Sequence, residues 1–340
     1  MKQKQILVFG YFGYVTNQLD GQTIKTRAIY NLLKERSEAK ISFADTQEFR
    51  SNKKSILLFI RDFLRCNTLV WLPAQNNLKF LFPLIWYASR IFRFEIIYIV
   101  IGGWLSTILG SLPFHKRRLK KIKSILVENH TTVKELEDCC GFKNLDVIPN
   151  FREIVPKPKI EKDEGELRLV FMARVNKMKG LDVIVEIAEH LKDINVTIDI
   201  YGPIFADDEA YFKSELIERF NSVKYCGVLQ PEVICDTLRH YDVMLFPTHY
   251  YTEGFPGSIM DAYRSGLPVI ATNWKHANEF IMDGISGYVV DFDKPAKEMV
   301  ERINILYNDR EMLLRMKEAA YNESLKYTPD IAYKVLHEYI

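Results

Sequence analysis

Residues 167–180 read LRLVFMARVNKMKG, and this stretch sets the fold prediction. The apolar run at 167–171 has the length of a buried strand, and from Leu181 onward apolar residues recur at helical spacing. A buried strand that leads through a short loop into a helix is the repeating unit of a parallel α/β sheet. The loop lies where such sheets bind ligands. Arg174 and Lys179 are therefore candidates for a diphosphate clamp. The alternative is that both are solvated basic residues at a domain edge.

The same alternation continues on both sides of this stretch and predicts two Rossmann-like, doubly wound α/β domains facing across a cleft. Residues 152–166 contain two prolines and alternating charges without apolar periodicity, which predicts a linker. We expect an N-terminal domain at 1–151, a linker at 152–166, a second domain at 167–325, and a C-terminal helix at 326–340. Strands are predicted at 5–9, 96–101, 124–127, 145–148, 167–171, 196–201, 223–225, 243–246, 269–271 and 287–290, with helices at 23–33, 78–92, 131–138, 181–191, 211–220, 233–240, 258–265, 299–307 and 310–321.

Composition excludes several classes of protein. The 340 residues are 48% hydrophobic and 26% charged, which is typical of a globular protein of about two domains and not of a disordered chain. Five cysteines without a CxxC pair argue against a disulfide framework or a zinc ribbon and favour a reducing cytosol. The first apolar run is too short for a signal peptide.

Charge is divided unevenly along the chain. Residues 1–150 carry 23 basic and 12 acidic side chains, a net charge of +11, whereas residues 151–340 carry 23 and 32, a net charge of −9. The first half is therefore expected to face an anionic partner, with nucleic acid, a phosphorylated ligand and an anionic membrane all open on charge alone.

A second candidate site reads EGFPGSIMDA at residues 253–262. Glu253 lies in a predicted loop, and Asp261 follows eight residues later inside a predicted helix. Amides after Pro256 remain available to an anion, and ionised carboxylates can accept hydrogen bonds from sugar hydroxyls. The alternative is that Glu253 caps the helix and that Asp261 interacts with the helix dipole.

Together these segments resemble retaining glycosyltransferases of the GT-B fold, in particular glycosyltransferase family four, the group one glycosyltransferases. The resemblance rests on Arg174 followed five residues later by Lys179-Gly180, on Glu253-Gly254-Phe255, and on the segments 265–272 and 283–290. It covers about 165–335 strongly and 1–150 in outline. The family's usual second acid of this motif is Glu, whereas this chain has Asp261, one methylene shorter.

The resemblance implies that the domain at 1–151 binds the acceptor, that the domain at 167–325 binds the nucleotide-sugar, and that the helix at 326–340 returns to the N-terminal domain. It also implies a role for each site residue. Arg174 and Lys179 would hold the diphosphate of the donor, and Glu253 would contact the hydroxyls of the donor sugar. The remaining donor-binding residues implied by the resemblance are Asp261 at the ribose, Gly257 and Ser258 at the distal phosphate and sugar, Gly202, Gly227 and Val228 near the base, and Gly21 in the first domain.

Several other motifs are assigned structural roles. The family often has a His after the strand predicted at 96–101, but this chain reads Gly102-Gly103-Trp104, so no such role is carried over. His130 is expected at a helix start. Asp291-Phe292-Asp293 is interpreted as a turn and not as a cation site, and Asp207-Asp208-Glu209 as acids at a helix start. We therefore expect no metal and no cofactor, with the nucleotide-sugar as co-substrate.

Two segments of the first half suggest a membrane surface. The predicted helix at 78–92 is apolar nearly all round, so it is either sandwiched in the core or dips into a membrane interface; charges within 78–105 exclude a transmembrane helix. The run at 115–123 is a solvated face or binds an anionic leaflet, and nucleic acid is not expected because no recognition motif accompanies it. The basic residues assigned to the membrane or acceptor side are Lys116, Arg117, Arg118, Lys120 and Lys121.

The resemblance implies a retaining, metal-independent hexosyltransferase that moves a sugar, with UDP as the expected nucleotide, to a glycan or lipid-linked saccharide in surface polysaccharide biosynthesis. Such an enzyme would be cytoplasmic and peripheral on the inner face of the cell membrane. Two alternatives remain open: another GT-B enzyme, such as a nucleotide-sugar epimerase or glycosyl phosphorylase, and a non-catalytic nucleotide-binding partner of a transferase.

Overall fold

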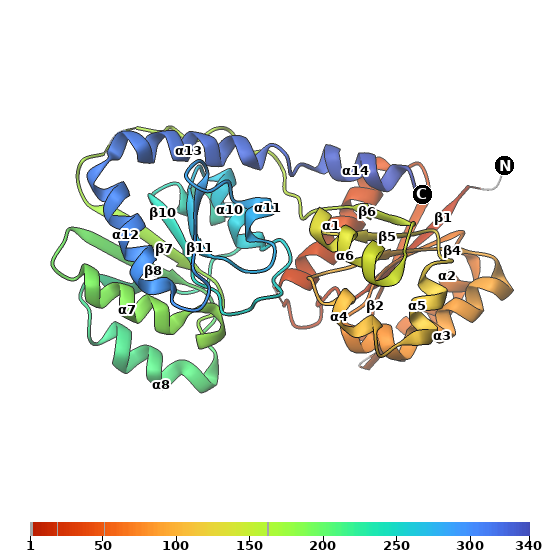
Figure 1. The fold of residues 1–340 in the computed structure, drawn as a ribbon. Helices are drawn as coiled ribbons and strands as arrows, with labels where there is room; N and C mark the ends of the chain where they lie inside the picture. Colours follow the sequence, from red (N-terminus) through yellow and green to blue (C-terminus); the bar gives the residue numbers. More distant parts are fainter. Residues whose placement is uncertain (1–2, 19, 51, 162) are drawn as a thin grey trace. The chain divides into compact units, whose positions relative to one another are not determined.

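A computed structural model describes residues 3–18, 20–50, 52–161 and 163–340. The chain divides into two compact units (Figure 1). The first comprises Met1–Phe151 together with Pro329–Ile340, and the second comprises Arg152–Thr328. The extended segment 152–166 thus belongs to the second unit, and the last helix belongs to the first.

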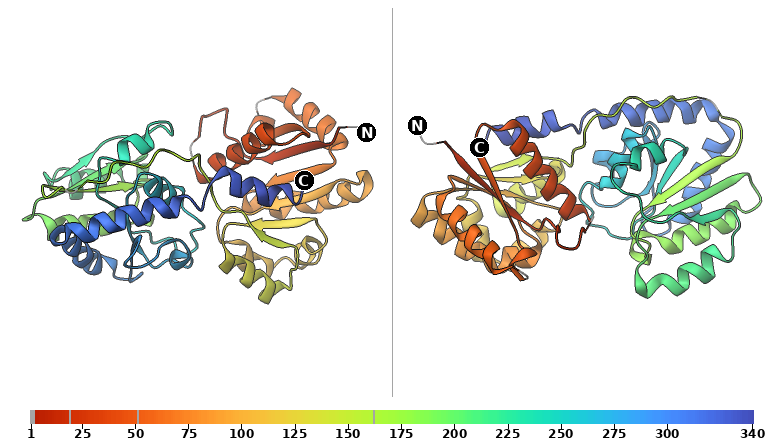
Figure 2. Two further views of the ribbon diagram at one scale, coloured as in Figure 1. Left: turned by 90° about the horizontal axis from the view of Figure 1, so that it is seen from above. Right: turned by 180° about the vertical axis from the view of Figure 1, so that it is seen from behind.

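In its described residues, the first unit has a six-stranded parallel sheet with the strand order β2-β1-β3-β4-β5-β6. Its strands are β1 (Gln5–Gly10), β2 (Lys40–Asp45), β3 (Thr68–Leu72), β4 (Glu95–Ile99), β5 (Ser124–Val127) and β6 (Leu145–Val147). Its helices are α1 (Gly21–Arg36), α2 (Lys53–Arg65), α3 (Gln75–Phe92), α4 (Leu105–Leu109), α5 (Pro113–Leu119), α6 (His130–Cys140) and α14 (Pro329–His337). Helix α14 packs beside α1, through Ala332 and Leu336 in the same core as Ile29 (Figure 2).

The second unit, over its described part, also has a six-stranded parallel sheet, with the order β12-β11-β10-β7-β8-β9. Its strands are β7 (Leu167–Met172), β8 (Val196–Tyr201), β9 (Val223–Tyr225), β10 (Val243–Phe246), β11 (Val269–Thr272) and β12 (Gly287–Val290). Its helices are α7 (Leu181–Leu191), α8 (Glu209–Phe212), α9 (Ile234–Leu238), α10 (Gly257–Arg264), α11 (Ala277–Phe280), α12 (Pro295–Asn308) and α13 (Arg310–Ser324). The predicted α/β class with two Rossmann-like domains is confirmed.

Some local predictions need correction. No element was predicted between residues 34 and 77, where β2, α2 and β3 lie. The helix predicted at 211–220 is a short α8 that continues as a π-helix over Lys213–Ile217. Helix α3 is neither sandwiched in the core nor wholly exposed: Leu78, Phe82 and Ile85 are buried, while Phe80 and Leu84 on another side are 74% and 69% exposed.

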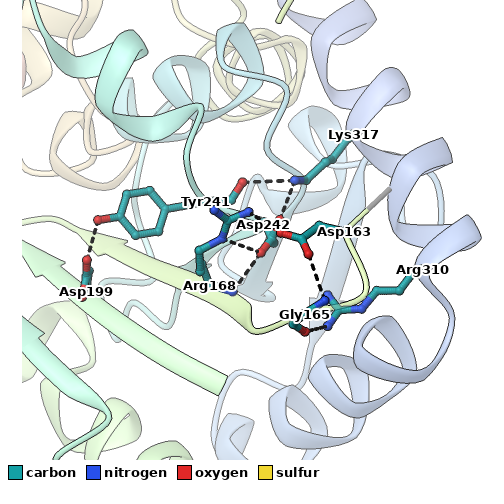
Figure 3. Close-up of polar contacts among 8 residues, drawn as sticks. All are labelled: Asp163, Gly165, Arg168, Asp199, Tyr241, Asp242, Arg310 and Lys317. Atoms are coloured by element: carbon teal, nitrogen blue, oxygen red, sulfur yellow. Dashed lines mark hydrogen bonds and ion pairs between the residues drawn. The ribbon is translucent and has the colours of Figure 1, made fainter. Parts of the chain in front are cut away.

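A polar network fastens the segment before β7 to the second unit at the amino ends of its strands (Figure 3). The buried Asp242 accepts hydrogen bonds from the Arg168 amide at 2.8 Å and from Lys317 Nζ at 2.7 Å. Arg310 donates to the Gly165 carbonyl at 2.9 Å. Burial opposes ionisation of Asp242, but the ammonium of Lys317 together with the amide and guanidinium of Arg168 outweighs it, so the pKa of this carboxyl lies below its usual value. The network lies at the opposite end of the sheet from the candidate site.

Candidate active site

The loop between β7 and α7 is held rigidly at the carboxyl edge of the second sheet. Asn176 accepts a hydrogen bond from the Lys179 amide at 2.9 Å, which fixes a 3-10 turn over Lys177–Lys179. Gly180 follows with φ +88°, and a Cβ there would lie 2.0 Å from the Pro247 carbonyl oxygen. Only glycine tolerates both the positive φ and this close approach. The loop is thereby pressed against the end of β10.

Main-chain and side-chain bonds join this loop to the loop after β10. The His249 amide donates to the Met178 carbonyl at 3.0 Å, and His249 Nε2 lies 3.0 Å from Asp182 Oδ1 at the start of α7. Thr248, which is 1% exposed, lies beneath the second loop and receives a hydrogen bond from the Tyr250 amide at 3.1 Å. Two loops that are far apart in sequence therefore form one surface.

Lys179 and Glu253 form an ion pair on this surface. Their side chains are only 15% and 14% exposed, and the Thr248 hydroxyl lies 3.2 Å from Glu253 Oε1 as a second donor. Lys179 Nζ also lies 5.9 Å from the ring centroid of Phe246 and 5.8 Å from that of Tyr250. The structure thus brings together two of the three residues predicted as catalytic, as counter-ions of each other.

Arg174, the third of these residues, is exposed, and its guanidinium faces solvent. Its neighbours are fixed in the sheet, because the Ala173 amide donates to the Tyr201 carbonyl at 3.1 Å and the Val175 amide to the Pro203 carbonyl at 2.9 Å. Within the described part of the chain, Arg174 makes no hydrogen bond or ion pair. A fixed backbone with a free bidentate donor suits the binding of an anion.

The glycines predicted near the nucleotide base lie beside Arg174. Gly202 has φ +137°, and a Cβ there would lie 1.8 Å from the Ala173 carbonyl oxygen. Its amide donates to the Gly227 carbonyl at 2.9 Å, and Tyr225 donates its hydroxyl to the Gly202 carbonyl at 2.9 Å. Gly227 faces open space and Val228 is 50% exposed. The ends of β8 and β9 thus form a tight, accessible platform.

Helix α10 carries the other predicted donor-binding residues of the second unit. It begins at Gly257, directly followed by Ser258, and Pro256 at its N-cap makes no side-chain hydrogen bond to the first turn. Asp261 is only 5% exposed and is paired with Arg152 Nε at 3.2 Å and with Arg264 Nη1 at 3.3 Å. A ribose hydroxyl would therefore have to share this carboxylate with two guanidinium groups.

Arg152, Thr248 and Asn176 were missed by sequence reasoning. Arg152 lies in the segment predicted as a linker, and its partner is 109 residues away, so no local pattern could have revealed it. Asn176 offered a signal, because Asn is a typical N-cap residue, whose side chain accepts a hydrogen bond from the amide three residues later.

In the first unit, Gly21 is the first residue of α1, behind an Asp20 cap that accepts from the Thr23 amide at 2.9 Å. The Gly102 amide, in the loop where the family often has a His, donates to Glu128 Oε2 at 3.1 Å. Glu128 also pairs with Lys25 at 2.9 Å, and both side chains are almost fully buried. Burial lowers the pKa of Lys25, against the opposing effect of Glu128.

The candidate metal motifs have structural partners. Asp291 Oδ1 accepts hydrogen bonds from the amides of Asp293 at 2.9 Å and Lys294 at 2.7 Å, as the turn interpretation predicts. Asp208, at the start of α8, accepts from the Lys177 amide at 3.1 Å. Over residues 3–18, 20–50, 52–161 and 163–340, no three His, Cys, Asp or Glu side chains are grouped as metal ligands.

The five basic residues predicted for the membrane or acceptor side lie on and after α5. Lys116 Nζ donates to the Cys139 carbonyl at 2.6 Å, and the Arg118 guanidinium lies 4.3 Å from the ring centroid of Trp86. Arg117 is exposed, and so are Lys120 and Lys121 beyond the end of the helix.

Comparison with known proteins identifies the family. The family described as "Glycosyl transferases group 1" matches residues 154–323, which is half of the chain. The chain belongs to this family, and the resemblance noted from the sequence is confirmed.

Individual relatives match part of the chain. Over 144 residues it is 30% identical to the "Uncharacterized 41.2 kDa protein in cps region" of Klebsiella pneumoniae, covering 42% of this chain and 37% of that protein. Over 163 residues it is 26% identical to N,N'-diacetylbacillosaminyl-diphospho-undecaprenol alpha-1,3-N-acetylgalactosaminyltransferase of Campylobacter jejuni, covering 48% and 41%. The matched part of the chain thus spans about two-fifths of the length of these relatives.

A solved structure is similar over its whole length. The crystal structure of Anabaena HepE in complex with UDP and glucose superposes with a TM-score of 0.75 at 15% identity and covers 99% of both chains. At this identity the likeness shows the fold, and the GT-B prediction is confirmed.

Proposed function

We propose that this protein is a retaining glycosyltransferase that transfers a sugar from a nucleotide-diphosphate-sugar, with UDP as nucleotide, to a glycan or lipid-linked saccharide. The single observation that carries this proposal is the meeting of Lys179 and Glu253, from loops 74 residues apart, at the sheet edge that Arg174 also borders. One cation and one acid in contact, with a second cation on the same sheet edge, suit a diphosphate joined to a polyhydroxylated sugar.

In this proposal each residue has a definite task. Arg174 and Lys179 bind the diphosphate and neutralise the charge that develops on it as the bond to the sugar breaks. Glu253 accepts hydrogen bonds from the sugar and orients its anomeric carbon. The acceptor hydroxyl attacks on the face that the diphosphate leaves, and a departing phosphate oxygen takes its proton, so the configuration is retained. The two cationic side chains perform the charge neutralisation for which other transferases use a metal.

The names of similar proteins support the choice of substrates. HepE was solved with UDP and glucose, and the Campylobacter relative is named for a diphospho-undecaprenol acceptor. We extend both features to this chain: a UDP-sugar donor, and an acceptor from polysaccharide biosynthesis carried on a lipid at the inner face of the cell membrane. The proposed location is therefore cytoplasmic and peripheral to the membrane.

A donor screen tests the proposal. Purified protein is incubated with UDP-, GDP- and ADP-sugars, with and without a lipid-diphosphate saccharide, in EDTA. We expect free UDP and a lengthened saccharide with the donor's anomeric configuration, both dependent on the acceptor. A new sugar nucleotide formed without acceptor would indicate an epimerase, and nucleotide binding without turnover on any acceptor would indicate a non-catalytic partner. Activity that is lost in EDTA and restored by Mn²⁺ would overturn the metal-independent mechanism.

A further inference from the structure

One face of the first sheet carries α2, α3, α4 and α5. Chain order puts β2 beside β1 and then carries the chain back across the sheet through β3, β4 and β5. Because crossovers between parallel strands are right-handed, the helices of these returning connections lie on one face, and α1 lies on the other. The core agrees: Phe59 of α2, Phe82 of α3 and Phe114 of α5 belong to one hydrophobic cluster. Figure 1 draws α2, α3 and α5 close together.

The outer sides of two of these helices are apolar. On α3, Phe80 is 74% exposed, Leu84 69% and Ile91 72%, and Tyr87 between them is 53% exposed. These positions fall at i, i+4, i+7 and i+11, so they form one stripe along the helix. A stripe of large apolar side chains facing water marks an interaction surface.

Helix α2 carries a second stripe of the same kind. Leu57 is 68% exposed, and Ile60 and Leu64 are each 46% exposed, at i, i+3 and i+7. No residue of α2 is fully buried, and only the partly buried Phe59 and Phe63 anchor it to the core. Both stripes are exposed and lie on helices that cover the same face of the sheet.

The positive charge of this unit is concentrated around these stripes. Residues 53–65 carry four basic and one acidic side chain, residues 75–93 three basic and none acidic, and residues 105–123 six basic and none acidic. The one acid, Asp62, is paired with Arg61 at 2.8 Å. These segments account for the whole positive excess of residues 1–150.

Cations also lie directly beside the α3 stripe. The Arg90 guanidinium is 5.3 Å and that of Arg118 is 4.3 Å from the ring centroid of Trp86, which neighbours Tyr87. Arg118 comes from α5, so the cationic segment borders the apolar stripe in space as well as in sequence.

We infer that α2 and α3 form a docking surface for an anionic lipid bilayer, with α5 as its cationic border. Apolar side chains would enter the interface while the surrounding lysines and arginines contact anionic headgroups. The helices would lie in the plane of the surface, since no helix among the described residues has the length and hydropathy to span a bilayer. This inference rests on the first unit alone and does not depend on the proposed chemistry.

Vesicle flotation tests the inference. The full chain is mixed at low salt with vesicles of phosphatidylcholine alone or with phosphatidylglycerol added. We expect binding only to the anionic vesicles and its loss at 1 M NaCl. The triple variant F80S/L84S/I91S should reduce the bound fraction at least tenfold, and L57S/I60S/L64S should reduce it several-fold. All six side chains are exposed, so both variants should keep wild-type circular dichroism.

The matched control removes three exposed apolar side chains from the second unit. In I285S/I305S/L325S the replaced residues are 53%, 37% and 41% exposed, and binding should stay within twofold of wild type. Wild-type protein that stays unbound with anionic vesicles, or an α3 variant that binds as well as the control, would overturn the inference. So would a wild-type dimer, seen by analytical ultracentrifugation, that the α3 substitutions dissociate, because a second copy would then be the occupant.

Discussion

Replacing Glu253 with Gln should strengthen binding of the nucleotide diphosphate and slow transfer of the sugar. In the structure Glu253 is the counter-ion of Lys179, and both are about 15% exposed. A diphosphate must displace the Glu253 carboxylate from the Lys179 ammonium before it can form its own ion pair with Lys179. Gln has the same shape, can still accept from the Thr248 hydroxyl, and leaves Lys179 without an anionic competitor.

The magnitude follows from the partial burial of the pair. Exposed ion pairs contribute about 0–1 kcal/mol and hydrogen bonds to charged groups about 1.5–3 kcal/mol, so a pair of intermediate exposure is worth about 1 kcal/mol. Since about 1.4 kcal/mol is a factor of ten, UDP should bind E253Q about three- to tenfold more tightly than wild type. Sugar transfer should fall at least about tenfold, because the charged acceptor for the sugar hydroxyls is lost.

Isothermal titration with UDP, together with kcat/KM for the donor, measures both effects. The matched control is D182N, because Asp182 is a nearby acid that pairs with His249 at 3.0 Å and not with Lys179. It removes the same charge without releasing the clamp, so its UDP affinity should change less than twofold. Equal or weaker UDP binding by E253Q, or an equal gain in D182N, would refute the reasoning.

Three further outcomes are expected. Arg174→Ala and Lys179→Ala should each lower kcat/KM at least about tenfold, since each removes a charged contact to the leaving group; unchanged steady-state kinetics in either variant would remove that residue from the clamp. Gly202→Ala should lower the free energy of unfolding by about 2 kcal/mol or more, because its methyl group would meet the Ala173 carbonyl. Gly227→Ala, in open space, should lower it by only about 1 kcal/mol. Equal effects of the two substitutions in urea unfolding would contradict the geometry. The pKa of Asp242 is lowered in the folded state, so its contribution to stability is present above about pH 4 and is lost as the pH falls further. Asp242→Asn should therefore reduce the free energy of unfolding at pH 7 and flatten its decline below about pH 4.

Strand and helix positions were predictable where an apolar run has clear ends. Residues 124–127 and 243–246 are short, wholly apolar or small, and bounded by polar residues or proline, and the structure places β5 and β10 there. Helix α2 was missed although its sequence carries a helical signal, since Ile56, Phe59, Ile60, Phe63 and Leu64 recur at i, i+3, i+4, i+7 and i+8. Phe59 and Phe63 of this set pack inward while Ile60 and Leu64 face water, so the spacing indicates a helix but not which of its apolar side chains are buried.

The position of the candidate residues at one sheet edge was predictable, but their contacts with one another were not. A residue in a loop directly after a strand is predicted to lie at the carboxyl edge of the sheet, because all strands of a parallel sheet end at that edge. Strand-end loops could not tell that Lys179 and Glu253 form an ion pair with each other, nor that Asp261 is shared between Arg152 and Arg264. The pairings of Lys179 with Glu253 and of Arg152 with Asp261 join residues 74 and 109 apart in sequence, which no local pattern encodes, whereas Arg264 lies only three residues after Asp261 on α10.

A crystal structure with a bound, non-hydrolysable UDP-sugar tests the central claim most directly. We predict phosphate oxygens within about 3 Å of Lys179 Nζ and of the Arg174 guanidinium. Glu253 should then be separated from Lys179 and should accept a hydrogen bond from a sugar hydroxyl. A donor bound elsewhere, with the pair between Lys179 and Glu253 intact and Arg174 still facing solvent, would contradict the account.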